Sequence, residues 1–153
     1  MSVHYSLDTS AILDGWVRHY PIQSFPGLWK RLSTAIVQGK VRATEEVLKE
    51  LEKIDDDCLK WCKNQTDLFI GVDTKIQETV IDILSTHPDL VQVATGRSAA
   101  DPFVIALAEI HGCTVITGET SKPSKPRIPD VCRDRGIPFG NLLYLIKNEN
   151  WSF

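Results

Sequence analysis

Short apolar segments alternate along the chain with longer segments in which apolar residues recur every three or four positions. The short, β-inclined segments predict strands at residues 3–7, 41–43 and 113–117. Helical spacing of apolar residues predicts helices near residues 11–16, 28–37, 44–54, 59–62, 76–84, 102–111, 130–135 and 142–147. Since strands and helices alternate, we expect an α/β fold with a short, mostly parallel central sheet that helices cover on both faces.

Capping residues, glycines and prolines indicate where the helices begin and end. Thr9 or Ser10 is expected to cap the first helix, and Gly39 is expected to follow the second. Pro102 suits the first position of a largely apolar helix that Gly112 terminates. A helix, a glycine and a buried strand in this order are typical of α/β packing.

Composition and charge indicate the general class to which this protein belongs. The chain has 153 residues, 42% of them hydrophobic and 24% charged, which suits a single domain over residues 1–153. No apolar run reaches the roughly 18 residues that cross a bilayer, and no export signal is visible, so we expect a cytoplasmic protein with no membrane partner. The net charge of −3 argues against general attraction to nucleic acid and leaves room for a local basic strip.

Four acidic residues stand where such a fold would place chemistry. Asp8 follows the first predicted strand, and Glu119 follows the strand at residues 113–117 after one glycine. Asp101 opens an apolar helix, and Glu50 lies in another helix. Carboxylates gathered at one edge of a sheet repel one another, and a bound Mg²⁺ or Mn²⁺ removes that repulsion. Such an ion can activate a water and stabilise charge on a phosphoryl oxygen, so the pattern suggests phosphodiester chemistry.

Each acid also has an ordinary structural interpretation. Asp8 and Asp101 could cap helices, Glu50 could be a solvated helix residue, and Glu119 could be a loop residue. Convergence of the four side chains is inferred from the fold class and not from their spacing in the sequence.

Four segments resemble, in order, the motifs of PIN-domain nucleases. The segment YSLDTSAILD looks like their first strand, which Asp-Thr-Ser closes, and TEEVLKEL resembles their second motif, with its acid at Glu50. The segment SAADPFVIALAEIHG resembles the third motif, where Asp101 opens an alanine-rich helix. Thr117-Gly118-Glu119 stands where the family usually has Thr-x-Asp. Residues 128–132 resemble a branch of that family known only as a domain of unknown function.

The resemblance implies a three-layer PIN-like fold and a metal-dependent endoribonuclease, often the toxin of a toxin–antitoxin pair. The catalytic and metal-binding residues that it implies are Asp8, Glu50, Asp101 and Glu119, with Mg²⁺ or Mn²⁺ as cofactor. The hydroxyl groups that would orient a carboxylate or a water are those of Thr9, Ser10 and Thr117, which could equally cap the backbone. The implied partners are an RNA substrate, a cognate antitoxin protein and a second copy of the chain.

Two departures from the family pattern stand out. Glu119 replaces the usual Asp and is one methylene longer. Glu46 lies one helical turn before Glu50 and is the alternative second ligand, although we favour Glu50. The expected contacts to RNA phosphates are Arg97, Lys122, Lys125 and Arg127.

Two other functions remain open from the sequence. One is a non-catalytic PIN-like module that binds RNA or protein, because Glu119 departs from the family pattern. The other is a phosphatase of the haloacid-dehalogenase type, which also begins with an Asp after a strand. Those enzymes usually carry a second Asp two residues further on, where this chain has Ser10.

Overall fold

The computed structural model describes residues 2–54, 56–91, 98–121 and 126–153. Within these residues the strands are β1 (Tyr5–Leu7), β2 (Val41–Thr44), β3 (Phe69–Ile70), β4 (Thr114–Ile116) and β5 (Phe139–Gly140). The α-helices are α1 (Thr9–Leu13), α2 (Pro26–Val37), α3 (Glu45–Glu52), α4 (Asp57–Lys63), α5 (Thr74–Thr86), α6 (Asp101–His111), α7 (Ile128–Arg135) and α8 (Leu142–Asn148). A π-helix (Asp14–His19) continues α1, and a short 3₁₀ helix (Pro88–Leu90) follows α5.

The five strands form one sheet in the order β3-β2-β1-β4-β5, and all four neighbouring pairs are parallel. The predicted α/β fold with a short parallel sheet is therefore confirmed. Strand β1 lies at the centre, where Tyr5 pairs with Val41 on one side and with Thr114 on the other. From β1 the chain continues to β2 and β3 on one side, and β4 and β5 lie on the other side, so the direction in which strands are added changes between β1 and β4. Ligands bind at such a switch point in open α/β sheets.

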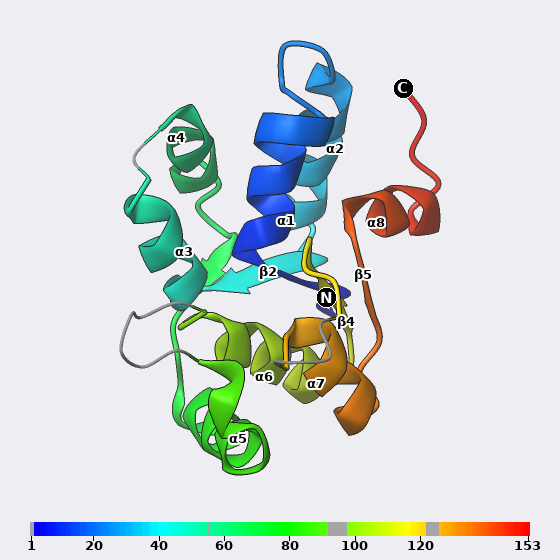
Figure 1. The fold of residues 1–153 in the computed structure, drawn as a ribbon. Helices are drawn as coiled ribbons and strands as arrows, with labels where there is room; N and C mark the ends of the chain where they lie inside the picture. Colours follow the sequence, from blue (N-terminus) through cyan, green and yellow to red (C-terminus); the bar gives the residue numbers. More distant parts are fainter. Residues whose placement is uncertain (1, 55, 92–97, 122–125) are drawn as a thin grey trace.

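Helices cover the two faces of the sheet in separate groups. Figure 1 shows α1 and α2 on one side of the sheet and α5, α6 and α7 on the other, with α3 beginning at the end of β2. Helix α6 is apolar nearly all round because it lies between the sheet and α5, and its Val104, Ile105 and Leu107 are fully buried. Ser6 in β1 donates a buried hydrogen bond of 2.7 Å to the Val104 carbonyl, which fixes α6 against the central strand.

Three local predictions need correction. The strands β3 and β5 were not predicted, because two-residue strands carry too short a pattern to register. The last-but-one helix begins at Ile128 with Pro129 in its first turn, and not at residue 130. Neither Thr9 nor Ser10 caps α1, since Asp8 occupies the N-cap position and Thr9 is already helical.

The cysteines lie in the interior, and the glycine predicted to end the apolar helix does so. Cys58, Cys62, Cys113 and Cys132 are all buried free thiols, and buried free thiols pack as small apolar groups. Gly112 ends α6 in the left-handed conformation, with φ 63°. Among the helices described, none is long and apolar enough to cross a bilayer.

Replacing Gly112 by alanine should lower the free energy of unfolding by about 1 kcal/mol. An added Cβ would meet no atom within 4 Å, so the cost is the strain of the left-handed backbone alone. Gly71→Ala is the matched control, because Gly71 is equally open and has no positive φ. Urea unfolding of both variants measures the difference. An equal loss of stability at the two positions would contradict the argument.

Candidate functional site

Three acidic side chains reach the switch point from three different elements. Asp8 directly follows β1, Glu119 follows β4, and Asp101 is the first residue of α6. The backbone N–H of Asp8 donates to the Ile116 carbonyl at 2.9 Å, which extends the β1–β4 pairing by one residue and fixes Asp8 beside the end of β4. One carboxylate oxygen from each of the three residues lies within 4.8 Å of the other two.

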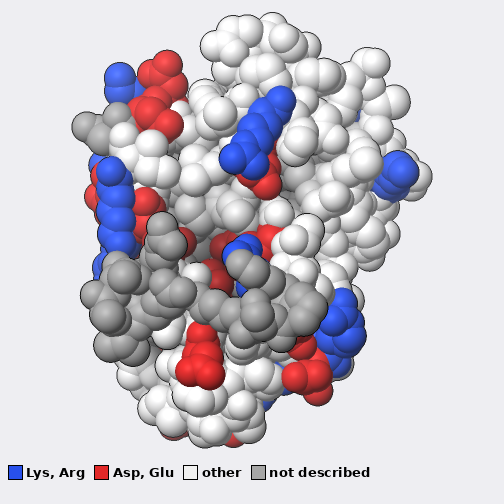
Figure 2. All heavy atoms as spheres, viewed as in Figure 1, with Lys and Arg blue, Asp and Glu red and all other residues white. Residues whose placement is uncertain are grey.

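The cluster forms one wall of an open cleft of about 860 Å³. The residues that line this cleft are Asp8, Thr9, Ser10, Leu13, Glu50, Lys53, Ile54, Ser98, Asp101 and Glu119. All four acids predicted as catalytic residues are among them. On the face shown in Figure 2, acidic atoms gather in a hollow near the centre of the molecule.

Neighbouring hydroxyl groups hold the Asp8 carboxylate in place. Ser10 Oγ and Thr117 Oγ1 both donate to Asp8 Oδ2, at 2.6 and 2.8 Å. The backbone N–H groups of Gly118 and Glu119 donate in turn to Ser10 Oγ and Thr117 Oγ1, at 2.8 and 3.0 Å. The side chain of Asp8 makes no capping bond to α1, so its carboxylate faces the cleft and not the helix that it precedes.

Glu50 lies in the same cleft but outside the tight group of three. Its Oε1 accepts a 2.6 Å hydrogen bond from Thr9 Oγ1, and its Oε2 accepts a longer one, 3.4 Å, from the backbone N–H of Ala100. Glu46 does not line the cleft and pairs with Lys49 at 3.0 Å. The structure therefore places Glu50, and not Glu46, beside the other acids.

Burial and mutual repulsion raise the pKa values of the clustered acids. Desolvation and the nearby Asp8 and Glu119 carboxylates raise the pKa of Asp101 to about 10. Burial and the charge of Asp8 raise the pKa of Glu119 to about 7. The pKa of Asp8 is also raised, chiefly by burial, although its bonds from Ser10 and Thr117 oppose the shift. Asp101 and Glu119 share a side-chain hydrogen bond, which requires a proton when no cation is bound.

The donor set fits a hard divalent cation. It consists of carboxylate oxygens alone, and Mg²⁺ and Mn²⁺ prefer such ligands. Among the described residues, no Lys or Arg forms an ion pair with Asp8, Glu50, Asp101 or Glu119. A cation placed between Asp8, Asp101 and Glu119 would restore their charged forms and remove the repulsion.

Two described basic residues, Lys53 and Arg127, act on or line the cleft. The charge of Arg127 lowers the pKa of Glu119 and so acts on the cluster. Arg97, Lys122 and Lys125, the other predicted phosphate contacts, lie outside the described residues. Lys53 lines the cleft and was not predicted. Its position three residues after Glu50, at the C-cap of α3, was the available signal, because residues three apart share a helix face.

Fold and site define an α/β protein with a carboxylate cluster at the switch point of a parallel sheet. The chain belongs to the family described as Domain of unknown function (DUF4411), which it matches over residues 5–153. All four acids lie within the matched region. No curated protein matches the chain.

The free energy of unfolding of the metal-free protein should fall as the pH rises from 4.5 to about 7. Glu119 has a pKa of about 7 in the folded chain and 4.5 as its ordinary value, so the folded state binds more protons in this window. At pH 8 the folded chain keeps Asp101 protonated, with a pKa of about 10, whereas the unfolded chain ionises it. Asp101→Asn removes the cost of holding this proton and should raise the free energy of unfolding at pH 8 by about 2 kcal/mol. Urea unfolding at pH 5 and pH 8 measures both effects.

Asp67→Asn serves as the control, because Asp67 is exposed and outside the cluster. It should leave stability at both pH values unchanged within about 0.5 kcal/mol. Mn²⁺ should stabilise the wild type at pH 8 and should stabilise Asp101→Asn much less. A wild type that gains no stability from Mn²⁺ would count against a metal centre.

Thr117→Val should weaken Mn²⁺ binding by about 10- to 100-fold while keeping the shape of the side chain. The change removes the hydroxyl that donates to Asp8 Oδ2 and that accepts from the Glu119 N–H. Thr79→Val is the matched control, because the Thr79 hydroxyl bonds only to the Lys75 carbonyl on the exposed side of α5. Calorimetric titration with Mn²⁺ compares the two, and equal affinities would show that the hydroxyl does not position Asp8.

Proposed function

We propose that this protein is a metal-dependent endoribonuclease that hydrolyses phosphodiester bonds in RNA. The observation that carries the proposal is the group formed by Asp8, Asp101 and Glu119, with oxygen atoms within 4.8 Å of one another and raised pKa values. Strongly shifted pKa values of acids in a cleft are typical of functional sites. The order of the four acids and their host elements supports the resemblance to PIN-domain nucleases.

Asp8, Asp101 and Glu119 would hold the ion, and Glu50 would act from the edge of the cleft through Thr9 or a water. When bound, a Mg²⁺ or Mn²⁺ ion supplies Lewis-acid stabilisation of charge on a phosphoryl oxygen and lowers the pKa of a bound water. Ser10 and Thr117 fix the position of the Asp8 carboxylate at the wall of the cleft. Lys53 and Arg127 would attract the RNA backbone toward an otherwise acidic site.

The expected setting of the activity comes from the family resemblance. We propose that the substrate is RNA, that the protein is the toxin of a toxin–antitoxin pair, and that it forms a homodimer in the cytoplasm. A cognate antitoxin would then inhibit the activity. Copurification with the product of an adjacent reading frame, and loss of RNA cleavage in that complex, would support this part of the proposal.

Asp8→Asn and Asp101→Asn should each reduce the rate of RNA cleavage by more than about 100-fold, because each removes a ligand of the ion. Chelation of divalent ions should abolish the wild-type activity, and Mn²⁺ or Mg²⁺ should restore it. Cleavage of single-stranded and structured RNA by the purified chain, free of any partner, measures these effects. Circular dichroism confirms that each variant is folded.

Glu46→Gln is the control, because Glu46 lies on the same helix as Glu50 but outside the cleft. It should cleave RNA at the wild-type rate. If the wild type leaves all RNAs intact with either ion, or if the two Asp variants retain full activity, the nuclease proposal fails.

A further inference from the structure

A second, smaller cavity lies beside the acidic cleft. It has a volume of about 220 Å³ and is lined by Ala11, Asp14, Gly15, His19, Tyr20, Gly118, Asn141, Leu142 and Leu143. The floor is apolar, since Ala11, Gly15 and Leu142 are buried, whereas His19 and Asn141 are exposed at the rim. This size suits one flat ring system and is smaller than the pockets that hold drug-sized ligands.

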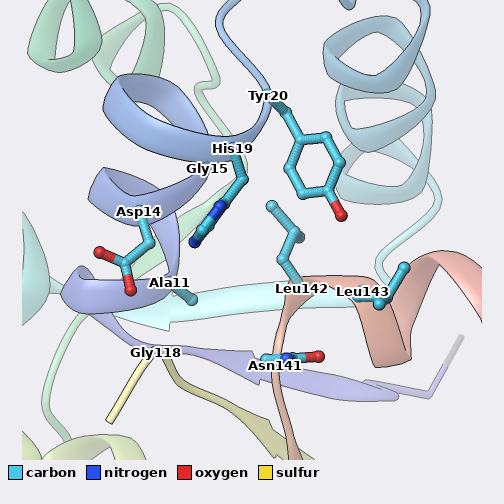
Figure 3. A pocket seen from close by; sticks show the side chains of 9 residues that line it. All are labelled: Ala11, Asp14, Gly15, His19, Tyr20, Gly118, Asn141, Leu142 and Leu143. Carbon is cyan, nitrogen blue, oxygen red and sulfur yellow. The ribbon is translucent and has the colours of Figure 1, made fainter.

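The π-helix at Asp14–His19 shapes one side of this cavity. The Tyr20 N–H donates to the Gly15 carbonyl at 2.7 Å, five residues earlier, which is the wide turn of a π-helix. Such turns are rare and occur frequently at functional sites. Figure 3 shows the ring of Tyr20 extending toward Leu142 and Leu143 at the start of α8, and the imidazole of His19 extending toward Asp14 and Ala11. The fold therefore places two aromatic rings over an apolar floor.

The rim of the cavity offers one hydrogen-bond donor, the Asn141 amide, and one acceptor, the Asp14 carboxylate. The Oδ1 atom of Asn141 accepts from the Tyr144 N–H at 2.9 Å as the cap of α8, so the amide group offers its N–H₂ to a ligand. Asp14 offers a carboxylate, which lies 3.5 Å from Arg18. A side chain at position 118 would collide with this carboxylate, so Gly118 is what lets Asp14 lie against the loop after β4.

The cavity and the acidic cleft share a wall. Ser10 and Glu119 line the cleft, and their immediate neighbours Ala11 and Gly118 line the cavity. The Gly118 N–H donates to Ser10 Oγ at 2.8 Å, so the same hydrogen bond holds both sides of this wall together. The cavity therefore adjoins the part of the cleft in which a phosphate bound to the acids would lie.

We propose that this cavity binds one unpaired nucleobase of the RNA, next to the phosphate that the acidic cluster attacks. The proposal rests on the proposed nuclease function and names the part of the substrate that lies beyond the acids. Unpaired bases are recognised in proteins by stacking on aromatic side chains and by hydrogen bonds to their edges. His19 and Tyr20 supply the rings, and Asn141 and Asp14 supply a donor and an acceptor for the base edge.

Titration with ribonucleotides tests the cavity without any cleavage. AMP, GMP, CMP and UMP are added separately to methyl-labelled protein, and the methyl signals of Ala11, Leu142 and Leu143 are followed by NMR. At least one nucleotide should shift these signals, and ribose 5-phosphate, which has no base, should not. His19→Ala should weaken that binding by about tenfold, as loss of one stacking partner implies.

Asn141→Ser removes the amide and keeps a side chain that can cap α8, so it should weaken binding or change which nucleotide binds most tightly. His111→Ala is the control for His19→Ala, because His111 is also exposed but lies at the far end of α6. This control should bind the nucleotides as the wild type does. In the cleavage assay, the two cavity variants should alter the base preferred beside the cut.

Three outcomes would overturn the proposal. The first is that no nucleotide shifts the methyl signals at millimolar concentration, and the second is that ribose 5-phosphate shifts them equally. The third is that only acetyl-arginine amide shifts them, which would assign the cavity to a side chain of a protein partner. Absence of nucleotide binding in a protein that cleaves RNA overturns the base site and leaves the nuclease standing. If nucleotides bind in a base-dependent way to a protein that cleaves no RNA, the base site stands and the nuclease proposal fails.

Discussion

Repulsion among buried carboxylates is the constraint around which this molecule is organised. Asp8 and Asp101 are 2% and 5% exposed, and no cationic side chain of the described chain is paired with either of them. Burying an unpaired charge costs several kcal/mol, so the metal-free protein keeps part of the cluster protonated. The proton shared by Asp101 and Glu119 is the consequence. A cation in its place lets the same side chains be charged, which makes ion binding and protonation competing events at one site.

The parallel sheet explains why these acids can be buried at all. Strands β1 and β4 end side by side, so the residues after them leave the core at the same place. There the backbone turns, and its N–H groups are free to donate to side chains. The Gly118 and Glu119 N–H groups donate to the Ser10 and Thr117 hydroxyls. These hydroxyls donate in turn to the Asp8 carboxylate. This chain of donors partly stabilises the charged form of Asp8, since hydrogen bonds to a carboxylate lower its pKa. The strands therefore need only three residues each to position the site.

Much of this arrangement could be predicted, because side chains that follow parallel strands meet at one edge whatever the details of packing. Asp8 and Glu119 needed only the strand assignments, and Asp101 only the start of its helix. The distinction between Glu50 and Glu46 depends on the rotation of α3, which tertiary contacts set. The hydroxyl partners were identified as candidates, but which carboxylate each one binds follows from the side-chain directions. The π-helix and the two-residue strand β5 leave no periodic signal, so the cavity that is lined by the π-helix and by the residues directly after β5 could not be foreseen.

The length of the Glu119 side chain suits the way the loop after β4 is held. The Gly118 N–H is bound to Ser10, and the Asp14 carboxylate lies close against Gly118, so the backbone here is drawn toward α1. Asp101 begins α6, which covers the opposite face of the sheet. A side chain from this loop must therefore cross the end of the sheet to reach the Asp101 carboxyl, and Glu119 does so. The same loop position brings Gly118 into the lining of the smaller cavity, so the loop that carries Glu119 borders both the cleft and the cavity.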